Sequence, residues 1–278
     1  MQHPFTQLEP HYAAQIAAMA INPNRIRELD EACDTLLEQR AAYQALSNAT
    51  SHGTPVAFLM AIAYREMSGN THCFLGNGQS LSRRTTIVPK GLGPWLQPYP
   101  QNFVAGGLTA LHIDGVDAVV MNGLPIAAYE SEALNGFGYM NRGLPSPYVF
   151  GGTNIQKPGK YVADGEFDSS EMDSQLGTLA IMERLFQRDA SLKFGDTIVK
   201  TPNVEPPAVP ATPLGLGGGI NVFILQQKLN ALHVNGTPLQ VDGNFGKATK
   251  RAVKSFQYTH HLTVDGLVGP QTIKALNA

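Results

Sequence analysis

The segment KTPNVEPPAVPATPLGLGGG, residues 200–219, is the feature that most constrains the fold of this chain. Its first part concentrates proline and its second part glycine. Proline resists helices and central strands, and glycine adds backbone freedom, so such a segment joins folded units. It predicts a large unit over residues 1–199, a linker over 200–219 and a small unit over 220–278. These sizes suit one large and one small domain.

The small unit contains an internal repeat. VDGNFGKAT begins at Val241 and VDGLVGPQT begins at Val264, so that both have the form VDGxxGxxT. Asp-Gly favours a turn, and the threonine suits a helix cap. Amphipathic segments, NVFILQQKLNALHV and KRAVKSFQYTHHL, flank the first copy. The pattern predicts a compact domain of three helices.

The two units differ in charge. Residues 206–278 hold six basic and two acidic side chains, a net charge of +4, whereas the whole chain carries −2 and the remainder therefore −6. A basic module on an acidic body suggests a polyanionic target. Bacterial cell wall and nucleic acid both satisfy this charge pattern.

The doubled motif resembles the peptidoglycan-binding domain at the ends of bacterial and phage wall hydrolases, and the resemblance covers residues 220–278. It implies bacterial peptidoglycan as the partner. The small unit has no aromatic ladder of the kind used by single-strand binders, so we expect no nucleic-acid partner. The motif residues expected to serve wall binding are Asp242, Gly243, Gly246, Asp265 and Gly266.

The large unit is predicted to be mainly α-helical. Asn22-Pro23 and Thr54-Pro55 are helix-start signals, which predict one long helix over 22–48 and another that ends at Gly69. Apolar spacing predicts further helices over 125–135 and 170–188. Residues 73–89 combine an Asn-Gly turn with a β-branched run, which predicts a short β-hairpin.

The run FLMAIAYREMSGN, residues 58–70, is almost wholly apolar until Arg65-Glu66. A carboxylate in the last turn of a core helix is desolvated and faces the negative end of the helix dipole. Both effects favour its protonated form. Cleavage of a glycosidic bond needs such an acid to protonate the leaving oxygen. The alternative is that Glu66 forms an ion pair with Arg65 or another cation.

Three ordered motifs, YREMSGN, LNGFGYMNRGLPSPYVFGGTN and GKYVADG, resemble the lysozyme-like superfamily, with phage and bacterial muramidases as the closest group. The resemblance spans residues 50–190. It implies a lysozyme-like catalytic domain with a small β-hairpin region, in which Glu66 is the catalytic acid. Thr85 falls in the hairpin expected to face the acid, and EALNGFGY, residues 132–139, matches the opposite wall of the sugar groove.

The sequence constrains the second catalytic group less than it constrains the acid. Many lysozymes have an aspartate shortly after the acid, but residues 67–88 contain neither Asp nor Glu. Glu132 is the first candidate, and its alternative role is a structural pair with Arg142 or Lys160. The substrate's own N-acetyl group is a further alternative, so hydrolysis and transglycosylation both stay open. The other candidate carboxylates are Asp114, Asp117 and Asp164.

Aromatic and amide side chains suit sugar binding, because rings cover apolar pyranose faces and amides bond hydroxyls. Turn formation and packing are the alternative roles. Histidines and cysteines lack metal-ligand spacing and no GxSxG motif occurs, so we expect no metal and no cofactor. The candidate substrate-binding residues, beside Thr85, are Asn135, Tyr139, Tyr148 and Asn154.

The combined expectation is a monomeric muramidase that cuts the β-1,4 bond between N-acetylmuramic acid and N-acetylglucosamine, as in a phage endolysin. Alternatives are a lytic transglycosylase, a secreted bacterial toxin, and a non-catalytic wall-binding or virion structural protein. The segment MQHPFTQLEP lacks the features of a signal peptide, and no apolar run suits a bilayer span. We therefore expect the protein in the host cytoplasm until its release to the periplasm and wall.

Overall fold

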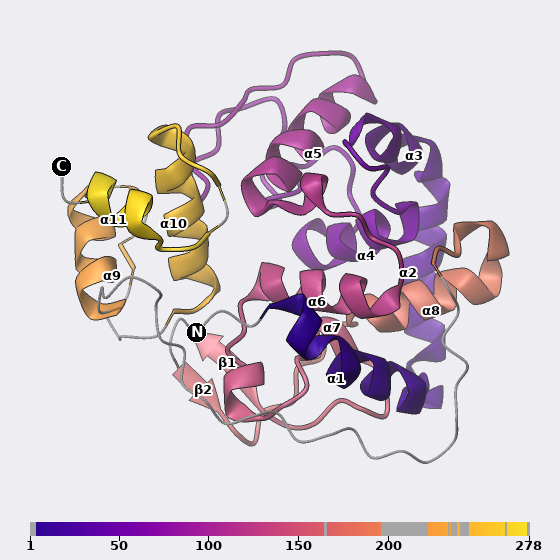
Figure 1. Cartoon of the computed structure of the whole chain (residues 1–278). Coiled ribbons are helices and arrows are strands. Elements are labelled where there is room, and N and C mark those ends of the chain that lie inside the picture. The colour runs from indigo at the N-terminus through magenta and orange to yellow at the C-terminus, as the bar shows by residue number, and fades with distance from the viewer. Residues whose placement is uncertain are drawn as a thin grey trace.

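The computed structural model describes residues 4–163, 166–195, 222–232, 234, 238–239, 245–264 and 266–276. Over these residues the chain is mainly helical with one two-stranded antiparallel sheet, which confirms the mainly α fold class. Figure 1 shows a large group of helices, here called the body, beside three C-terminal helices, here called the C-terminal module. The linker expected over 200–219 lies outside the described residues.

The body contains eight α-helices and two short strands among its described residues. Four short 3₁₀ turns join them: η1 Pro23–Arg25, η2 Val116–Ala118, η3 Met140–Arg142 and η4 Ala190–Leu192. The helices are α1 Phe5–Ala18, α2 Ile26–Glu38, α3 Arg40–Ala49, α4 Val56–Met67, α5 Gln101–Asp114, α6 Leu124–Asn135, α7 Pro147–Phe150 and α8 Thr178–Arg188; the strands are β1 Lys160–Ala163 and β2 Glu166–Asp168. The C-terminal module consists of α9 Val222–Ala231, α10 Lys247–Thr259 and α11 Pro270–Leu276.

Buried apolar side chains form two separate clusters. One extends from Leu8 to Leu192, and the other from Leu225 to Leu276. Helix α4 lies in the first cluster, where residues 57–63 are all buried and the helix contacts α2, α3 and α8. Since burying one large apolar side chain contributes about 1.5–3 kcal/mol, α4 is fixed firmly in the body. Side chains at its end are therefore held in place.

The long helix predicted over 22–48 is wrong in one respect, because it divides at Gln39 into α2 and α3. The Gln39 side chain donates to the carbonyl of Gly69 at 2.9 Å and accepts from the backbone amide of Thr71 at 3.0 Å. Gln39 thus satisfies backbone groups of the segment that follows α4. The break between α2 and α3 therefore places Gln39 where it holds the residues that follow α4.

The hairpin predicted over 73–89 is also corrected, because this segment forms an irregular loop with a single bridge between Cys73 and Ser80. The side-chain oxygen of Gln79 accepts from the amides of Thr86, at 2.8 Å, and Ile87, at 3.2 Å. A side chain therefore takes the place of a partner strand. The sheet of this fold is instead β1 with β2, later in the chain.

The helix predicted over 170–188 begins only at Thr178. Residues before it are held by a close backbone approach, in which the amide of Gly177 donates to the carbonyl of Gly151 at 2.7 Å. A Cβ at Gly177 would meet the carbonyl oxygen of Val149 at 2.5 Å, so glycine is needed there. Helices α1 and α5 were not foreseen. No helix of the described residues is long and apolar enough to span a membrane.

Candidate active site

The end of α4 positions Glu66. The helix stops where Ser68 adopts the left-handed conformation, with φ of 54°, and Gly69 follows with φ of 74°. The amide of Gly69 donates to the carbonyl of Ala63 at 3.1 Å, which closes the helix end. Glu66 therefore lies in the last turn of a buried helix, as predicted, and its side chain is 11% exposed.

Tyr148 and Arg251 both bind the Glu66 carboxylate. The hydroxyl of Tyr148 donates to Oε1 at 3.1 Å, and Nη2 of Arg251 donates to Oε2 at 2.7 Å. Arg65, the neighbour in sequence, instead bonds Asp173 at 3.5 Å and lies over the ring of Tyr148. The ion-pair alternative for Glu66 is thus realised in this structure, but its cation comes from the C-terminal module.

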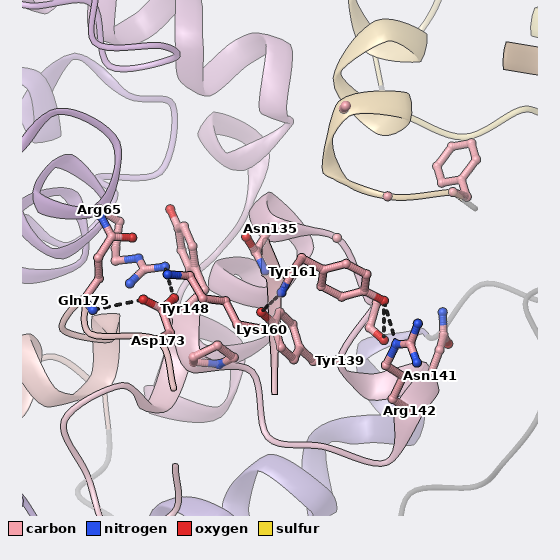
Figure 2. Close-up of a pocket in the computed structure, with 16 residues that line it drawn as sticks. Arg65, Asn135, Tyr139, Asn141, Arg142, Tyr148, Lys160, Tyr161, Asp173 and Gln175 are labelled. Atoms are coloured by element: carbon pink, nitrogen blue, oxygen red, sulfur yellow. Dashed lines mark hydrogen bonds and ion pairs between the residues drawn. The ribbon is translucent and has the colours of Figure 1, made fainter. Parts of the chain in front are cut away.

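A pocket of about 590 Å³ (Figure 2) adjoins this carboxylate through Arg65 and Tyr148, which line it, whereas Glu66 itself is not among the lining residues. Asn135, Tyr139 and Tyr148 all line it, so the structure brings together three of the five predicted substrate-binding residues. Tyr148 also bonds Glu66, which connects the acid to the pocket wall. The volume lies within the range usual for small-ligand sites. Three residues of the C-terminal module complete the lining: Phe245, Gly246 and Ala248.

Aromatic packing shapes one wall of the pocket. The rings of Tyr139 and Tyr161 meet edge to face at 5.2 Å, and Phe167 of β2 packs against both. The hydroxyl of Tyr139 accepts from the backbone amide of Tyr161 at 3.1 Å. Arg142 donates to the hydroxyl of Tyr161 at 3.0 Å and lies over the ring of Phe167. The short sheet thus supplies Tyr161 and Phe167 to this wall, and the segment at η3 supplies Tyr139 and Arg142.

Thr85 and Asn154 do not line the pocket. The hydroxyl of Thr85 is buried and donates to the carbonyl of Pro89 at 2.6 Å, within its own loop. The side chain of Asn154 bonds the backbone at Ala18 and Ala20, and so ties the end of α1 to the loop after α7. In this structure both side chains hold loops in place, which is the alternative role considered for such residues.

Glu132 lies in the last turn of α6 but does not face the pocket. Its side chain is buried, and Oε2 accepts from the hydroxyl of Tyr12 in α1 at 2.8 Å. The structural partner is thus Tyr12 rather than Arg142 or Lys160. Burial raises the pKa of Glu132 to about 7, against smaller opposing effects of Tyr12 and the Met140 backbone. This geometry favours a structural role.

Other candidate carboxylates have partners away from the pocket. Asp117 pairs with His112 at 3.1 Å, and Asp114 lies 3.5 Å from Nζ of Lys254. Asp164 lies outside the described residues. The carboxylate that does line the pocket is Asp173, which bonds Arg65. Sequence reasoning missed Asp173 because it placed this residue inside the helix predicted over 170–188.

In the C-terminal module, the last threonine of each repeated motif bonds to a neighbouring helix. Thr249 and Thr272, the last residue of each motif, do not cap helices but accept from the side-chain amides of Gln226 and Gln257, at 3.1 and 3.0 Å. Gly266 has φ of 71°, and a Cβ there would meet Cε of Lys254 at 2.8 Å. Each threonine thus joins its helix to the preceding one. Asp242, Gly243 and Asp265 lie outside the described residues.

Comparison with known proteins identifies this module. Residues 218–276 match the family model "Putative peptidoglycan binding domain", so the C-terminal part of the chain is a peptidoglycan-binding domain. The zinc D-Ala-D-Ala carboxypeptidase of Streptomyces albus G is 40% identical over 52 residues, which are 19% of this chain and 20% of the relative. The chain thus spans about a fifth of that relative's length. No solved structure matches the chain.

The described part of the chain contains no group of three or more His, Cys, Asp or Glu side chains placed to hold a metal ion. Cys33 and Cys73 are free thiols, and burial raises the pKa of both. Their thiolate forms are therefore disfavoured at neutral pH. The ionisable side chains that line the pocket are instead the carboxylate of Asp173, three tyrosine hydroxyls and the cations of Arg65, Arg142 and Lys160, and Glu66 adjoins them through its bond with Tyr148.

Proposed function

We propose that this protein is a muramidase that cleaves the β-1,4 bond between N-acetylmuramic acid and N-acetylglucosamine in peptidoglycan. The observation that carries the proposal is Glu66, a nearly buried carboxylate at the end of a core helix, joined through Tyr148 to a pocket lined by amides and aromatic rings. The peptidoglycan-binding domain brings the body to the same polymer. The resemblance of three ordered motifs to lysozyme-like muramidases supports the same assignment.

In this mechanism Glu66 carries the proton that it donates to the leaving glycosidic oxygen. Its position in the last turn of an apolar helix limits solvation of the charged form, and the negative end of the α4 dipole acts in the same direction. Tyr148 donates a hydrogen bond to Oε1, which fixes the rotamer of the carboxyl group. Asn135 and Tyr139 offer a polar group and a ring face to the sugar.

The second group of the reaction is open to two candidates. Asp173 lines the pocket and is held by Arg65, so it is the carboxylate best placed to act on the sugar. Alternatively the substrate's N-acetyl group assists, and no second protein carboxylate beside Glu66 is then needed. A lytic transglycosylase would use the same acid without a hydrolytic water. The biological setting that we propose is a phage endolysin acting on the wall after its release from the host cytoplasm.

The test is product analysis of purified sacculi treated with the full chain. A muramidase releases fragments that end in a reducing N-acetylmuramic acid, whereas a transglycosylase releases the anhydro form, which is lighter by one water. Because one relative is named a D-Ala-D-Ala carboxypeptidase, release of free D-alanine is followed in the same digest. Reducing muramic ends without free D-alanine would support the proposal. Intact glycan strands after prolonged digestion would refute it.

A further inference from the structure

Three cations on one face of α10, Lys250, Arg251 and Lys254, bond to the body. Besides the Arg251–Glu66 pair, Nζ of Lys250 donates to the carbonyl of Ala133 at 2.8 Å. Nζ of Lys254 donates to the backbone carbonyl of Asp114 and lies 3.5 Å from its carboxylate. These cations account for half of the six basic residues that give residues 206–278 their positive charge.

The three contacted positions share one property, because each lies in the C-terminal turn of a helix. Glu66 lies one residue before the end of α4, Asp114 is the last residue of α5, and Ala133 lies two residues before the end of α6. The last carbonyls of a helix lack partners within it and carry the negative end of its dipole. Three negative helix ends therefore converge on one basic helix face. Figure 1 shows α10 as the module helix that lies beside α5.

Further contacts extend this interface over the pocket. Phe245, Gly246 and Ala248, at the start of α10, form part of the pocket lining. The side chain of Lys250 lies 5.9 Å from the ring centre of Phe137 in the loop after α6. Lys250 and Lys254 also interact electrostatically with Glu130 of α6. The module thus covers both the candidate acid and one side of the pocket.

We propose that this docked arrangement is autoinhibited, with Arg251 holding Glu66 as a carboxylate until the wall draws the module away. The inference rests on the proposed function, in which Glu66 must carry a proton. A guanidinium 2.7 Å from Oε2 favours the charged form and occupies an oxygen from which the proton would be donated. In the docked state Glu66 therefore carries no proton to donate, although the protein stays folded.

The release step follows from the chemistry of the target. Peptidoglycan carries many carboxylates on its peptides, and these compete for the three cations that bind the body. Wall binding and docking then use the same face of α10, so they exclude each other. The enzyme would be inactive while it is free in solution and active on the wall.

The experiment compares full-length chains on two substrates: short soluble glycan strands stripped of peptides, and intact sacculi. Arg251→Ala frees Glu66, and Lys250→Gln weakens docking without contacting Glu66. We expect Arg251→Ala to cleave the soluble strands faster than the wild type, within the about 5–150-fold range of coupling between sites, and Lys250→Gln to gain less. On sacculi both variants should lose this advantage and should not exceed the wild type, because Arg251 and Lys250 also bind the wall in this account. Lys274→Ala removes one charge from the exposed side of α11 and should match the wild type on both substrates.

Solution scattering of the same full-length proteins gives a second measurement, in which Arg251→Ala should have the larger radius of gyration. The inference is overturned if neither Arg251→Ala nor Lys250→Gln exceeds the wild type on soluble strands while all of them cut sacculi. A wild type that cuts no glycan in either substrate would instead refute the proposed function itself.

Discussion

The C-terminal ends of α4 and α6 look alike in the sequence and differ in the folded protein. Each helix is largely apolar and carries a glutamate in its last turn, Glu66 in α4 and Glu132 in α6. Each carboxylate also accepts a hydrogen bond from a tyrosine hydroxyl, from Tyr148 at 3.1 Å and from Tyr12 at 2.8 Å. Helix position and the first hydrogen bond therefore do not distinguish the two groups.

The difference lies in what covers each helix end. Glu132 is covered by α1, which is part of the body, and the residue as a whole is 1% exposed. Glu66 is covered by α10 of the C-terminal module, which approaches with the cation of Arg251. One carboxyl is sealed in the core, and the other lies at an interface that can open onto a pocket. The chemistry of a helix-end glutamate is thus decided by the element packed on it.

The largest expected effect is that of Glu66→Gln. This substitution removes the proton donor with little change in volume, and loss of general acid catalysis costs about 10²–10⁴ in rate. The rate of release of reducing ends from sacculi measures the loss, and circular dichroism checks that the fold is kept. Glu132→Gln is the matched control and should keep nearly full activity. A comparable loss in both variants would remove the functional distinction between the two helix ends.

The next effect concerns the stability of the body against pH. The pKa of Glu132 is about 7 in the folded chain, above its ordinary 4.5, so the folded state keeps a proton that the unfolded chain releases as pH rises. The free energy of unfolding should therefore fall between about pH 4.5 and 7, by roughly 3 kcal/mol in all. Chemical denaturation of Glu132→Gln should show a flatter profile and a higher stability than the wild type at about pH 8. Parallel profiles for the two proteins would contradict this account of Glu132.

Replacing Tyr12 or Tyr148 with phenylalanine tests the ends of α6 and α4 separately. Tyr12→Phe removes the hydroxyl that donates to the buried Glu132 carboxyl and should lower the free energy of unfolding by about 1–3 kcal/mol, with glycan cleavage unchanged. Tyr148→Phe removes a bond to Glu66 and should slow glycan cleavage by roughly fivefold, equivalent to about 1 kcal/mol. Denaturation midpoints and initial cleavage rates of both variants test whether Tyr12 acts on stability and Tyr148 on activity. An activity loss confined to Tyr12→Phe would reverse the assignment.

The smallest expected effect is in the pocket beside Glu66. Asn135→Ala should raise KM for soluble glycan strands by about 2- to 10-fold with kcat nearly unchanged, because one hydrogen bond to the sugar is lost. Asn154→Ala is the control, since Asn154 bonds only to the backbone near α1 among the bonds described for its side chain, and its KM should equal that of the wild type. Equal KM values for Asn135→Ala and the wild type would place the sugar elsewhere.

The sequence predicted features that depend on neighbours along the chain. The apolar run of α4, its end at residues 68–69 and the span of α6 follow from local signals. Of the pocket residues expected from the sequence, Asn135 ends α6, Tyr139 lies just before η3, and Tyr148 lies in α7. A local pattern also led to the hairpin over 73–89, which the structure corrects because Gln79 satisfies the amides that a strand would have used.

Long-range contacts were beyond the sequence. Tyr12 and Glu132 are 120 residues apart, and Arg251 and Glu66 are 185 apart on the two sides of residues 200–219. No spacing rule connects such residues. The positive charge of the module was read as a wall-binding feature, but Lys250, Arg251 and Lys254 also bind the body. The doubled motif could be recognised from the sequence, because both copies lie within one short stretch of the chain. Residues 218–276 match the family model for a peptidoglycan binding domain.

The role of Glu66 as the proton donor is tested most directly by the dependence of the Glu66→Gln defect on the leaving group. An aryl glycoside of a chitin oligomer with an acidic phenol leaves without protonation, whereas a sugar leaving group requires it. The ratio of wild-type to Glu66→Gln rates should therefore be about 10²–10⁴ on glycan strands and should approach one on the activated aryl glycoside. An equally large defect on both substrates would show that Glu66 does not act as the acid.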